Sequence, residues 1–252
     1  YSAVYNGEFY LVSGSDYLPS ALYSSVVQVF SPDRDSWRVA FYMEKEYVWA
    51  CCAVLDTKLI IAGGMSVKLT YEYPEYWNGI ARDPQLSVQA YDLQTHEFVE
   101  IPPLLEYAWH ASACVVGRQL YIAGGGGSNH LQMLDGSKTT MEWTLKAPLP
   151  ATRAQAASCE YHGMLMLIGG DVNEENGPSD SVILYDPQTD TWMKGPTLPE
   201  PRYCCKAVKY KGGILLVSPR DEKPLFLNSK GEWKVFCHVP VGATRKLCIE
   251  AV

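Results

Sequence analysis

Several features are scarce in this sequence of 252 residues, and each scarcity excludes a class of protein. No apolar run approaches the roughly 20 residues that a transmembrane helix requires, and no N-terminal signal peptide pattern is present. Charged residues make up only 19% of the chain and hydrophobic residues 47%, which excludes a disordered chain. The net charge of −7 argues against binding to nucleic acids or anionic membranes, because both need a basic surface.

Metal-binding and catalytic patterns are also missing. The eight cysteines and five histidines show neither Cys-x-x-Cys nor His-x₃-His spacing, and no nucleophile–base pair or pair of carboxylates is recognisable. Two cysteine pairs are adjacent, at 51–52 and 204–205. Neighbours on a strand point to opposite faces, so such pairs rarely form disulfides. We therefore expect reduced thiols, a cytosolic or nuclear location, no metal, no cofactor and no catalytic residues.

What the sequence does contain is an internal repeat. Each copy of the repeat consists of a small-residue stretch, a short apolar strand, a polar turn and a second strand that ends in Gly-Gly. The clearest copies are ACCAVLDTKLIIAGG at 50–64, SACVVGRQLYIAGG at 112–125 and AASCEYHGMLMLIGG at 156–170. Weaker copies lie at 2–14 and 206–219. A second feature follows each copy but the third: two aromatic residues seven positions apart flank a turn, namely Phe30 and Trp37, Tyr91 and Phe98, Tyr185 and Trp192, and Phe226 and Trp233. In the third copy Trp143 is present, but Leu134-Asp135-Gly136 replaces the aromatic turn.

These phrases resemble the kelch motif, whose marks are the Gly-Gly doublet, the downstream Tyr and the Trp. The resemblance covers nearly the whole chain, and a repeat near 50 residues is typical of kelch sequences. It implies an all-β protein, a kelch β-propeller with four antiparallel strands per blade. Five repeats are recognisable, at about 1–45, 46–105, 106–150, 151–200 and 201–240, and an extra inner strand follows at 245–252.

The extra strand leaves the blade number open. A six-bladed parent with part of one blade outside this sequence is one interpretation, and closure as five blades is the other. Aligning the repeats on their polar turns places Cys51, Ala111, Ala156, Cys205 and Cys248 together. All five are small, which suits inner strands that converge on an axis, and we expect Gly-Gly to occupy backbone with positive φ or close approach.

The resemblance also suggests where a ligand would bind. In kelch proteins that recruit substrates to ubiquitin ligases, ligands contact the residue before the first strand, the residues after Gly-Gly, and a small polar residue before the third strand. The first position holds Arg153 and Arg202, and in the second and third repeats Val48 and Ala108 with neighbouring aromatics Tyr47, Trp49, Tyr107 and Trp109. The second position holds Asp171 and Arg220, and the third holds Ser87 and Ser181.

For each group of candidates a structural role is the alternative. The arginines could instead bind a loop carbonyl or a carboxylate between blades, and the Tyr/Trp pairs could pack against the inner strands. The longest insertion, at 65–85, carries Tyr76 and Trp77 among four aromatic residues. It either folds back on the propeller or presents an aromatic surface.

Three functions compete on this basis. The kelch resemblance favours a protein–protein interaction module, most like the substrate-binding kelch domain of BTB-kelch adaptors of cullin-RING ubiquitin ligases, with a cullin bound through a domain outside this chain. A cytoskeletal, actin-associated scaffold is the alternative. An enzyme is disfavoured, although kelch-like propellers include an oxidase and an epimerase. The expected partner is a protein or peptide on the loop rim, with its acidic part near Arg153 and Arg202.

Overall fold

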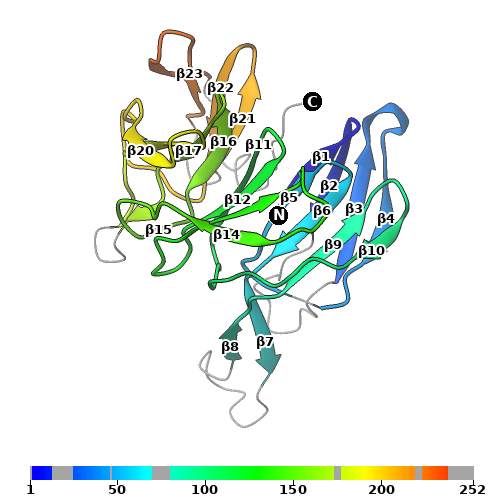
Figure 1. Cartoon of the computed structure of the whole chain (residues 1–252). Coiled ribbons are helices and arrows are strands. Elements are labelled where there is room, and N and C mark those ends of the chain that lie inside the picture. The colour runs from blue at the N-terminus through cyan, green and yellow to red at the C-terminus, as the bar shows by residue number, and fades with distance from the viewer. Residues whose placement is uncertain are drawn as a thin grey trace.

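The computed structural model describes residues 2–12, 25–45, 47–69, 80–172, 177–218 and 223–237. These residues form five four-stranded antiparallel sheets arranged as the blades of a β-propeller (Figure 1). The one helical element among them is a 3₁₀ turn, Pro32–Arg34. The all-β propeller expected from the repeats is therefore confirmed.

Each sheet falls within one repeat, and its strands follow one another in sequence order. Blade 1 contains β1 (Ser2–Tyr5), β2 (Glu8–Val12), β3 (Val26–Ser31) and β4 (Ser36–Tyr42); blade 2 contains β5 (Cys51–Leu55), β6 (Lys58–Ala62), β9 (Val88–Asp92) and β10 (Glu97–Val99); blade 3 contains β11 (Ser112–Val116), β12 (Gln119–Ala123), β13 (Leu131–Asp135) and β14 (Trp143–Lys146). Blade 4 contains β16 (Ala157–Tyr161), β17 (Met164–Ile168), β19 (Val182–Asp186) and β20 (Thr191–Lys194); blade 5 contains β21 (Lys206–Tyr210), β22 (Gly213–Val217), β23 (Leu225–Leu227) and β24 (Trp233–Val235). Two short ribbons complete the list, β7 (Met65–Leu69) with β8 (Ile80–Pro84) and β15 (Arg153–Ala154) with β18 (Asp171–Val172).

The hydrophobic core is divided into layers between neighbouring blades. Four buried clusters join blades 1 and 2, 2 and 3, 3 and 4, and 4 and 5. The inner strands pack in the same order, β1 beside β5, β5 beside β11, β11 beside β16 and β16 beside β21. A blade exposes two apolar faces that it cannot bury alone, so stacking is what stabilises the fold.

The Gly-Gly doublets lie where one blade's backbone touches the next. The first glycines, Gly63, Gly124 and Gly169, have φ near +65°, and a Cβ on any of them would collide with a carbonyl oxygen of the following blade. The second glycines donate their N–H to that same segment: Gly125 N to Arg153 O is 2.8 Å and Gly170 N to Arg202 O is 2.7 Å. Positive φ and close approach, the two expected reasons for glycine, both apply.

The aromatic pairs form cross-strand partners on the outer strands. Phe30 faces Trp37, Tyr91 faces Phe98, and Tyr185 faces Trp192. In blade 3 Leu134 takes the aromatic position opposite Trp143. In blade 5 the two aromatic residues flank the turn but are not direct partners, because Trp233 faces Leu227 and Phe226 faces Lys234. The turn at 228–232 leaves five residues between paired positions, where the turns of blades 1, 2 and 4 leave four, and this shifts the partner of the tryptophan by one residue.

The register expected for the second repeat is also wrong by one residue. Cys51 is the partner of Ala62, as Ala157 is of Ile168, so Ala50 and not Cys51 aligns with Ala111, Ala156 and Cys205. Likewise Tyr47 and not Val48 aligns with Ala108 and Arg153. Ala50 and Cys51 are both small, so residue size could not fix the register. The predicted closing strand at 245–252, with Cys248, lies outside the described residues.

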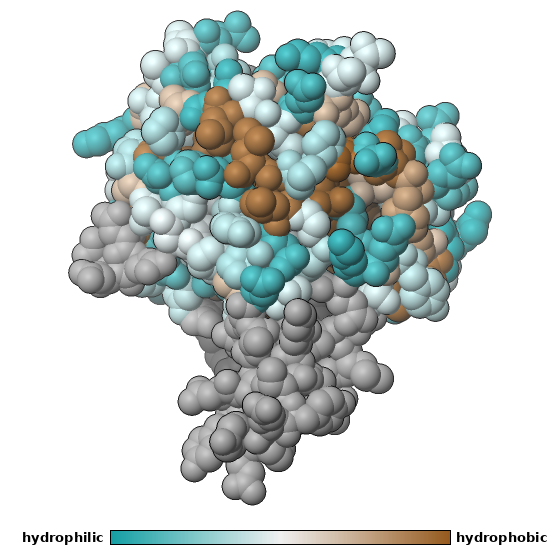
Figure 2. All heavy atoms as spheres, turned by 60° about the horizontal axis from the view of Figure 1, so that its bottom comes forward, coloured by the Kyte–Doolittle hydropathy of each residue, from teal (hydrophilic) through white to brown (hydrophobic). Residues whose placement is uncertain are grey.

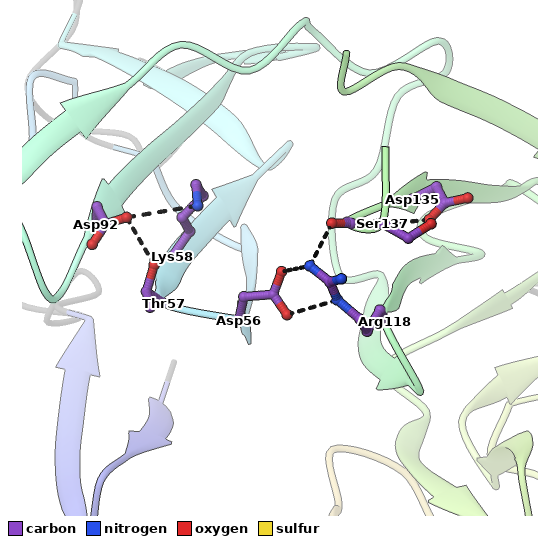
Figure 3. Close-up of polar contacts among 8 residues, drawn as sticks. Asp56, Thr57, Lys58, Asp92, Arg118, Asp135 and Ser137 are labelled. Carbon is purple, nitrogen blue, oxygen red and sulfur yellow. Dashed lines mark hydrogen bonds and ion pairs between the residues drawn. The ribbon is translucent and has the colours of Figure 1, made fainter. Parts of the chain in front are cut away.

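The hairpin turns at the far ends of the inner strands carry ion pairs between blades. Arg118 in the β11–β12 turn binds Asp56 in the β5–β6 turn through two contacts, Nε to Oδ1 at 3.2 Å and Nη2 to Oδ2 at 2.7 Å (Figure 3). The guanidinium holds the pKa of Asp56 below its usual value. Within blade 2, Asp92 accepts a hydrogen bond from Thr57 and forms an ion pair with Lys58. The Arg118–Asp56 pair joins blades 2 and 3 at the end opposite the Gly-Gly doublets.

Candidate functional site

A chain of backbone hydrogen bonds crosses the blades where the inner strands begin. His110 N donates to Trp49 O, Gln155 N to His110 O, and Cys204 N to Gln155 O, each at 2.9 Å. The four residues precede the inner strands of blades 2, 3, 4 and 5, and we call them the mouth ring. All four have left-handed backbone with φ between +53° and +58°.

That conformation is unusual for residues other than glycine, asparagine and aspartate, and costs on the order of 1 kcal/mol or more per residue. It persists here because backbone hydrogen bonds link each residue to the next, with His110 and Gln155 bonded on both sides and Trp49 and Cys204 on one. Strained residues of this kind cluster at functional sites more than elsewhere. The mouth ring also borders the central channel, a cavity of about 790 Å³ whose lining includes His110, Gln155 and Cys204.

The side chains of the mouth ring differ from blade to blade. Trp49 and His110 stack with ring centroids 4.6 Å apart and planes inclined by 29°. On the other side, the Cys204 thiol donates to Gln155 Oε1 at 2.5 Å. All four side chains are partly exposed. One side of the mouth therefore offers aromatic faces and the other an amide, so a bound segment would meet chemically different walls.

Arg153, a predicted ligand contact, is instead 5% exposed. Its guanidinium donates to Gly169 O, to Ser181 O at 3.3 Å, and to Ser181 Oγ at 2.7 Å. Burial lowers the pKa of Arg153 to about 10. Arg153 therefore links Gly169, in the Gly-Gly doublet of blade 4, to Ser181 at the start of β19. This is the structural role given above as the alternative to ligand contact.

Arg202 is similarly placed and is 4% exposed. It forms an ion pair with Glu200 Oε1 at 2.6 Å and donates to Lys223 O at 3.3 Å. Both arginines lie at the same end of the propeller, because each accepts the N–H of the preceding doublet's second glycine through its carbonyl. The expected common position is correct, but the guanidinium groups point into the protein and not toward a ligand.

Ser87 and Tyr47 repeat the arrangement of Ser181 and Arg153 in blade 2. Ser87 Oγ donates to Tyr47 Oη at 2.5 Å, and Tyr47 is 7% exposed. The predicted serines and Tyr47 therefore connect strands within their blades. Their predicted contact with a ligand would require displacing these bonds.

The remaining predicted residues are at least partly accessible. Tyr107 is 50% exposed, and the neighbouring Leu105 is 48% exposed. Trp109 packs its indole over Gly126, where any Cβ would collide with it. Asp171 is partly exposed beside Cys204, whose pKa it raises. Figure 2 shows apolar side chains gathered among polar ones on one face of the molecule. Tyr76, Trp77 and Arg220 lie outside the described residues.

His110, Gln155 and Cys204 were missed as candidates from the sequence. They stand fourteen positions before the first glycine of the doublet, or before Ser218 in its place in blade 5, as Trp49 does. Aligning the repeats on the Gly-Gly doublet would have found these residues, because the start of the inner strand varies between repeats. The four residues have no chemical type in common, so only their shared position in the repeat identifies them.

Several thiols on or just before the inner strands lie in surroundings that favour their protonated form. Burial raises the pKa of Cys51 and of Cys114 to about 12, and of Cys204 and Cys205 to about 11. The seven described cysteines are free. Within the described ranges, no three His, Cys, Asp or Glu side chains gather in a way that could hold a metal ion.

Known proteins resemble this chain in sequence and fold. The kelch motif model matches residues 152–199. Kelch-like protein terF of Aspergillus terreus is 26% identical over 226 residues, covering 85% of this chain and 48% of that protein. Kelch-like protein 35 of Mus musculus is 26% identical over 201 residues, covering 78% and 31%. The chain thus spans less than half the length of these relatives.

A solved structure, titled "Structure of YjhT", superimposes with a TM-score of 0.71 at 16% identity, covering 93% of this chain and 78% of that one. At that identity the likeness concerns the fold. Among the described residues, no helix is both long and apolar enough to cross a membrane.

Proposed function

This chain is a β-propeller of the kelch-repeat family, and we propose that it binds a protein ligand at the mouth ring. The observation that carries the proposal is the ring itself: four residues hold strained left-handed backbone around one channel opening, while their side chains differ between blades. A purely structural ring would be expected to use glycine, which adopts that backbone without strain.

The chemistry of the mouth suggests the ligand. An apolar or aromatic side chain would pack on the stacked rings of Trp49 and His110, because aromatic residues dominate binding hot spots. The Gln155 amide would bond the ligand backbone. Arg153 and Arg202 are buried, so the earlier expectation of an acidic ligand beside their guanidinium groups loses its support.

We further propose that this binding selects substrates for a cullin-RING ubiquitin ligase, with the cullin bound by another part of the protein. The resemblance to BTB-kelch adaptors supports this role. Co-precipitation of a cullin with the intact protein tests it. If the intact protein binds its ligand but no cullin co-precipitates with it, the ligase role is wrong. The mouth ring would then be the docking site of a scaffold protein.

The binding site itself is tested by His110→Gly combined with Gln155→Gly. Glycine tolerates the positive φ at both positions, so the variant removes two side chains without adding strain. The matched control is His162→Gly, which removes a histidine of φ +51° from the hairpin turn at the opposite end of blade 4.

Proteins retained by the wild-type chain would be quantified by affinity mass spectrometry against both variants. We expect specific partners to lose at least tenfold in affinity with the mouth variant, about 1.4 kcal/mol, and to be retained by His162→Gly. Equal binding by all three folded proteins would place the ligand elsewhere.

A further inference from the structure

Blade 5 differs from the rest of the chain in its charge. Residues 201–240 hold eight of the chain's 21 basic residues but three of its 28 acidic residues, although the whole chain carries a net charge of −7. In the described part of this repeat, one carboxylate is exposed, Glu232, against six exposed lysines: Lys206, Lys209, Lys211, Lys223, Lys230 and Lys234. Salt screens exposed charges beyond roughly 8 Å, so the charge of blade 5 acts at its own surface.

Ion pairs balance only part of this charge. Two lysines are paired, Lys209 with Glu160 of blade 4 and Lys234 with Glu232. Lys211 and Lys230 form no ion pair with any residue that the structure describes. Both are exposed, so an anion from solution would reach them.

Lys211 and Lys230 lie at the same end of blade 5. Lys211 begins the two-residue turn between β21 and β22, and Lys230 lies in the turn between β23 and β24. Figure 1 shows the hairpin of β21 and β22 turning at the end of the molecule opposite the ribbon of β7 and β8. Neighbouring strands are about 4.8 Å apart, so the centres of the two turns are separated by roughly 10 Å.

The backbone of the inner turn disfavours lysine. Lys211 has φ +43°, and the equivalent positions of blades 1, 2 and 3 hold Asn6, Asp56 and Gly117. Asparagine, aspartate and glycine tolerate left-handed backbone better than other residues do. In blade 4 the position holds His162, with φ +51°. Blades 4 and 5 therefore carry an ionisable side chain where backbone strain opposes it, and strained positions cluster at functional sites.

Each of these two side chains lies on the tyrosine that precedes it. Lys211 Nζ is 5.2 Å from the centroid of the Tyr210 ring, and the rings of His162 and Tyr161 have centroids 4.3 Å apart. Both tyrosines are partly exposed. The residues just before them form the ion pair between blades 4 and 5, so the tyrosines lie at the same level on neighbouring strands.

We propose that this surface, formed by Tyr161, His162, Tyr210, Lys211 and Lys230 and named the basic end, binds an acidic segment of another protein. In an extended segment, residues two positions apart face the same way and are roughly 6.6 Å apart. Two such carboxylates would pair with Lys211 and Lys230, whose long side chains reach across the remaining distance. An apolar residue of the segment would pack on the tyrosines. Binding there is independent of the ligand proposed for the mouth ring, which lies at the opposite end of the channel.

Other polyanions fit the basic end less well. A nucleic acid needs a row of cations along its phosphates. The outer turn of blade 4, at the same end, instead carries Asp186 and Asp190, which would repel a long polyanion. A second copy of this chain would have to bind through a different, acidic surface. Such a heterologous contact produces a ring or an open filament and not a two-fold dimer.

A fluorescent peptide in which glutamate alternates with valine tests the proposal by anisotropy. We expect it to bind the chain, its glutamine counterpart not to bind, and its affinity to fall as salt is raised. Lys211→Asn combined with Lys230→Gln should weaken binding at least about fivefold, since two exposed ion pairs are lost. Asparagine tolerates the left-handed turn, so this variant removes charge without adding strain.

The matched control is Arg34→Gln combined with Lys138→Gln. It removes the same charge from exposed outer turns of blades 1 and 3 at the same end of the propeller. Affinity for the peptide should stay at the wild-type value in this control. It should also stay so in the mouth variant, His110→Gly with Gln155→Gly, which separates the basic end from the mouth ring.

Four results would overturn the proposal. The peptide does not bind, or the control pair weakens it as much as the Lys211 and Lys230 pair. A single-stranded oligonucleotide binds the basic end more tightly than the peptide does, which would make it a nucleic-acid surface. In sedimentation, the chain self-associates in a way that Lys211→Asn with Lys230→Gln abolishes, which would assign the surface to a second copy.

Discussion

At the scale of single residues, the same position does different work in different blades. Sixteen positions before the first glycine, Arg153 and Tyr47 both reach a serine at the start of the third strand, whereas Ala108 leaves that bond unmade. Residue type alone therefore did not show which side chains are bonded within the blade. An arginine beside a strand looks like a ligand contact in sequence, and only its burial shows that it is a structural clamp.

The cysteines should show their environment in their reactivity. At pH 8 the thiols of Cys51, Cys114, Cys204 and Cys205 should be protonated, because their pKa values are raised to between about 11 and 12. Thiolate is the reactive form. Brief iodoacetamide treatment of native protein should label the exposed Cys237 first, and denatured, unreduced protein should yield eight labelled cysteines. Rapid native labelling of Cys51 would contradict its burial.

At the scale of elements, the repeat was enough to predict the strands, and the structure shows why. Gly-Gly is fixed by backbone contact in blades 2, 3 and 4, and the aromatic pair by cross-strand packing in blades 1, 2 and 4, so both leave a periodic signal. The mouth ring leaves no such signal. Its backbone bonds are made by peptide groups, which all residues carry, so Trp49, His110, Gln155 and Cys204 share a position without sharing a residue type.

An acid-sensitive contact joins blades 3 and 4. Asp190 Oδ1 accepts bonds from Tyr185 Oη at 2.6 Å and from Ala147 N at 2.9 Å, and these bonds lower the pKa of Asp190. A carboxyl with a depressed pKa stabilises the fold fully above its unfolded pKa, near 3.9, and loses that contribution as pH falls through the folded value.

Asp190→Asn should therefore lower the melting temperature at pH 7, and the difference from wild type should shrink as the pH falls below about 4. Asparagine suits the left-handed backbone of Asp190, so the variant changes the charge without changing the turn. Thermal melts between pH 3 and 7 would measure this, with Asp33→Asn in the exposed turn of blade 1 as the control. If the melting-temperature difference between Asp190→Asn and wild type does not change with pH, the effect comes from packing and not from the charge of Asp190.

At the scale of the whole molecule, five blades enclose four buried layers in the described structure. Among the described residues, blades 2, 3 and 4 each pack on two sides, while blades 1 and 5 pack on one. The blade number stayed open at the level of the sequence, because the strand predicted at 245–252 is compatible with both interpretations. In the described structure the face of blade 1 that carries Gln28 and Trp37 is exposed.

This difference should appear in the local stability of equivalent strands. In stacked repeats each unit is stabilised mainly by its nearest neighbours, and local opening follows the least supported units. The second strands of the blades are suitable probes because each is hydrogen-bonded on both edges: β2, β6, β12, β17 and β22.

Hydrogen exchange of the 252-residue chain under native conditions, followed by mass spectrometry of peptides from these strands, should show faster exchange in β2 and β22 than in β12. The comparison uses residues that are paired on both edges, such as Phe9–Leu11 in β2 and Ile214–Leu216 in β22, so that the difference reports blade packing and not hydrogen bonding. Equal protection of all five strands in the 252-residue chain would show that blades 1 and 5 already support each other and that the ring is closed.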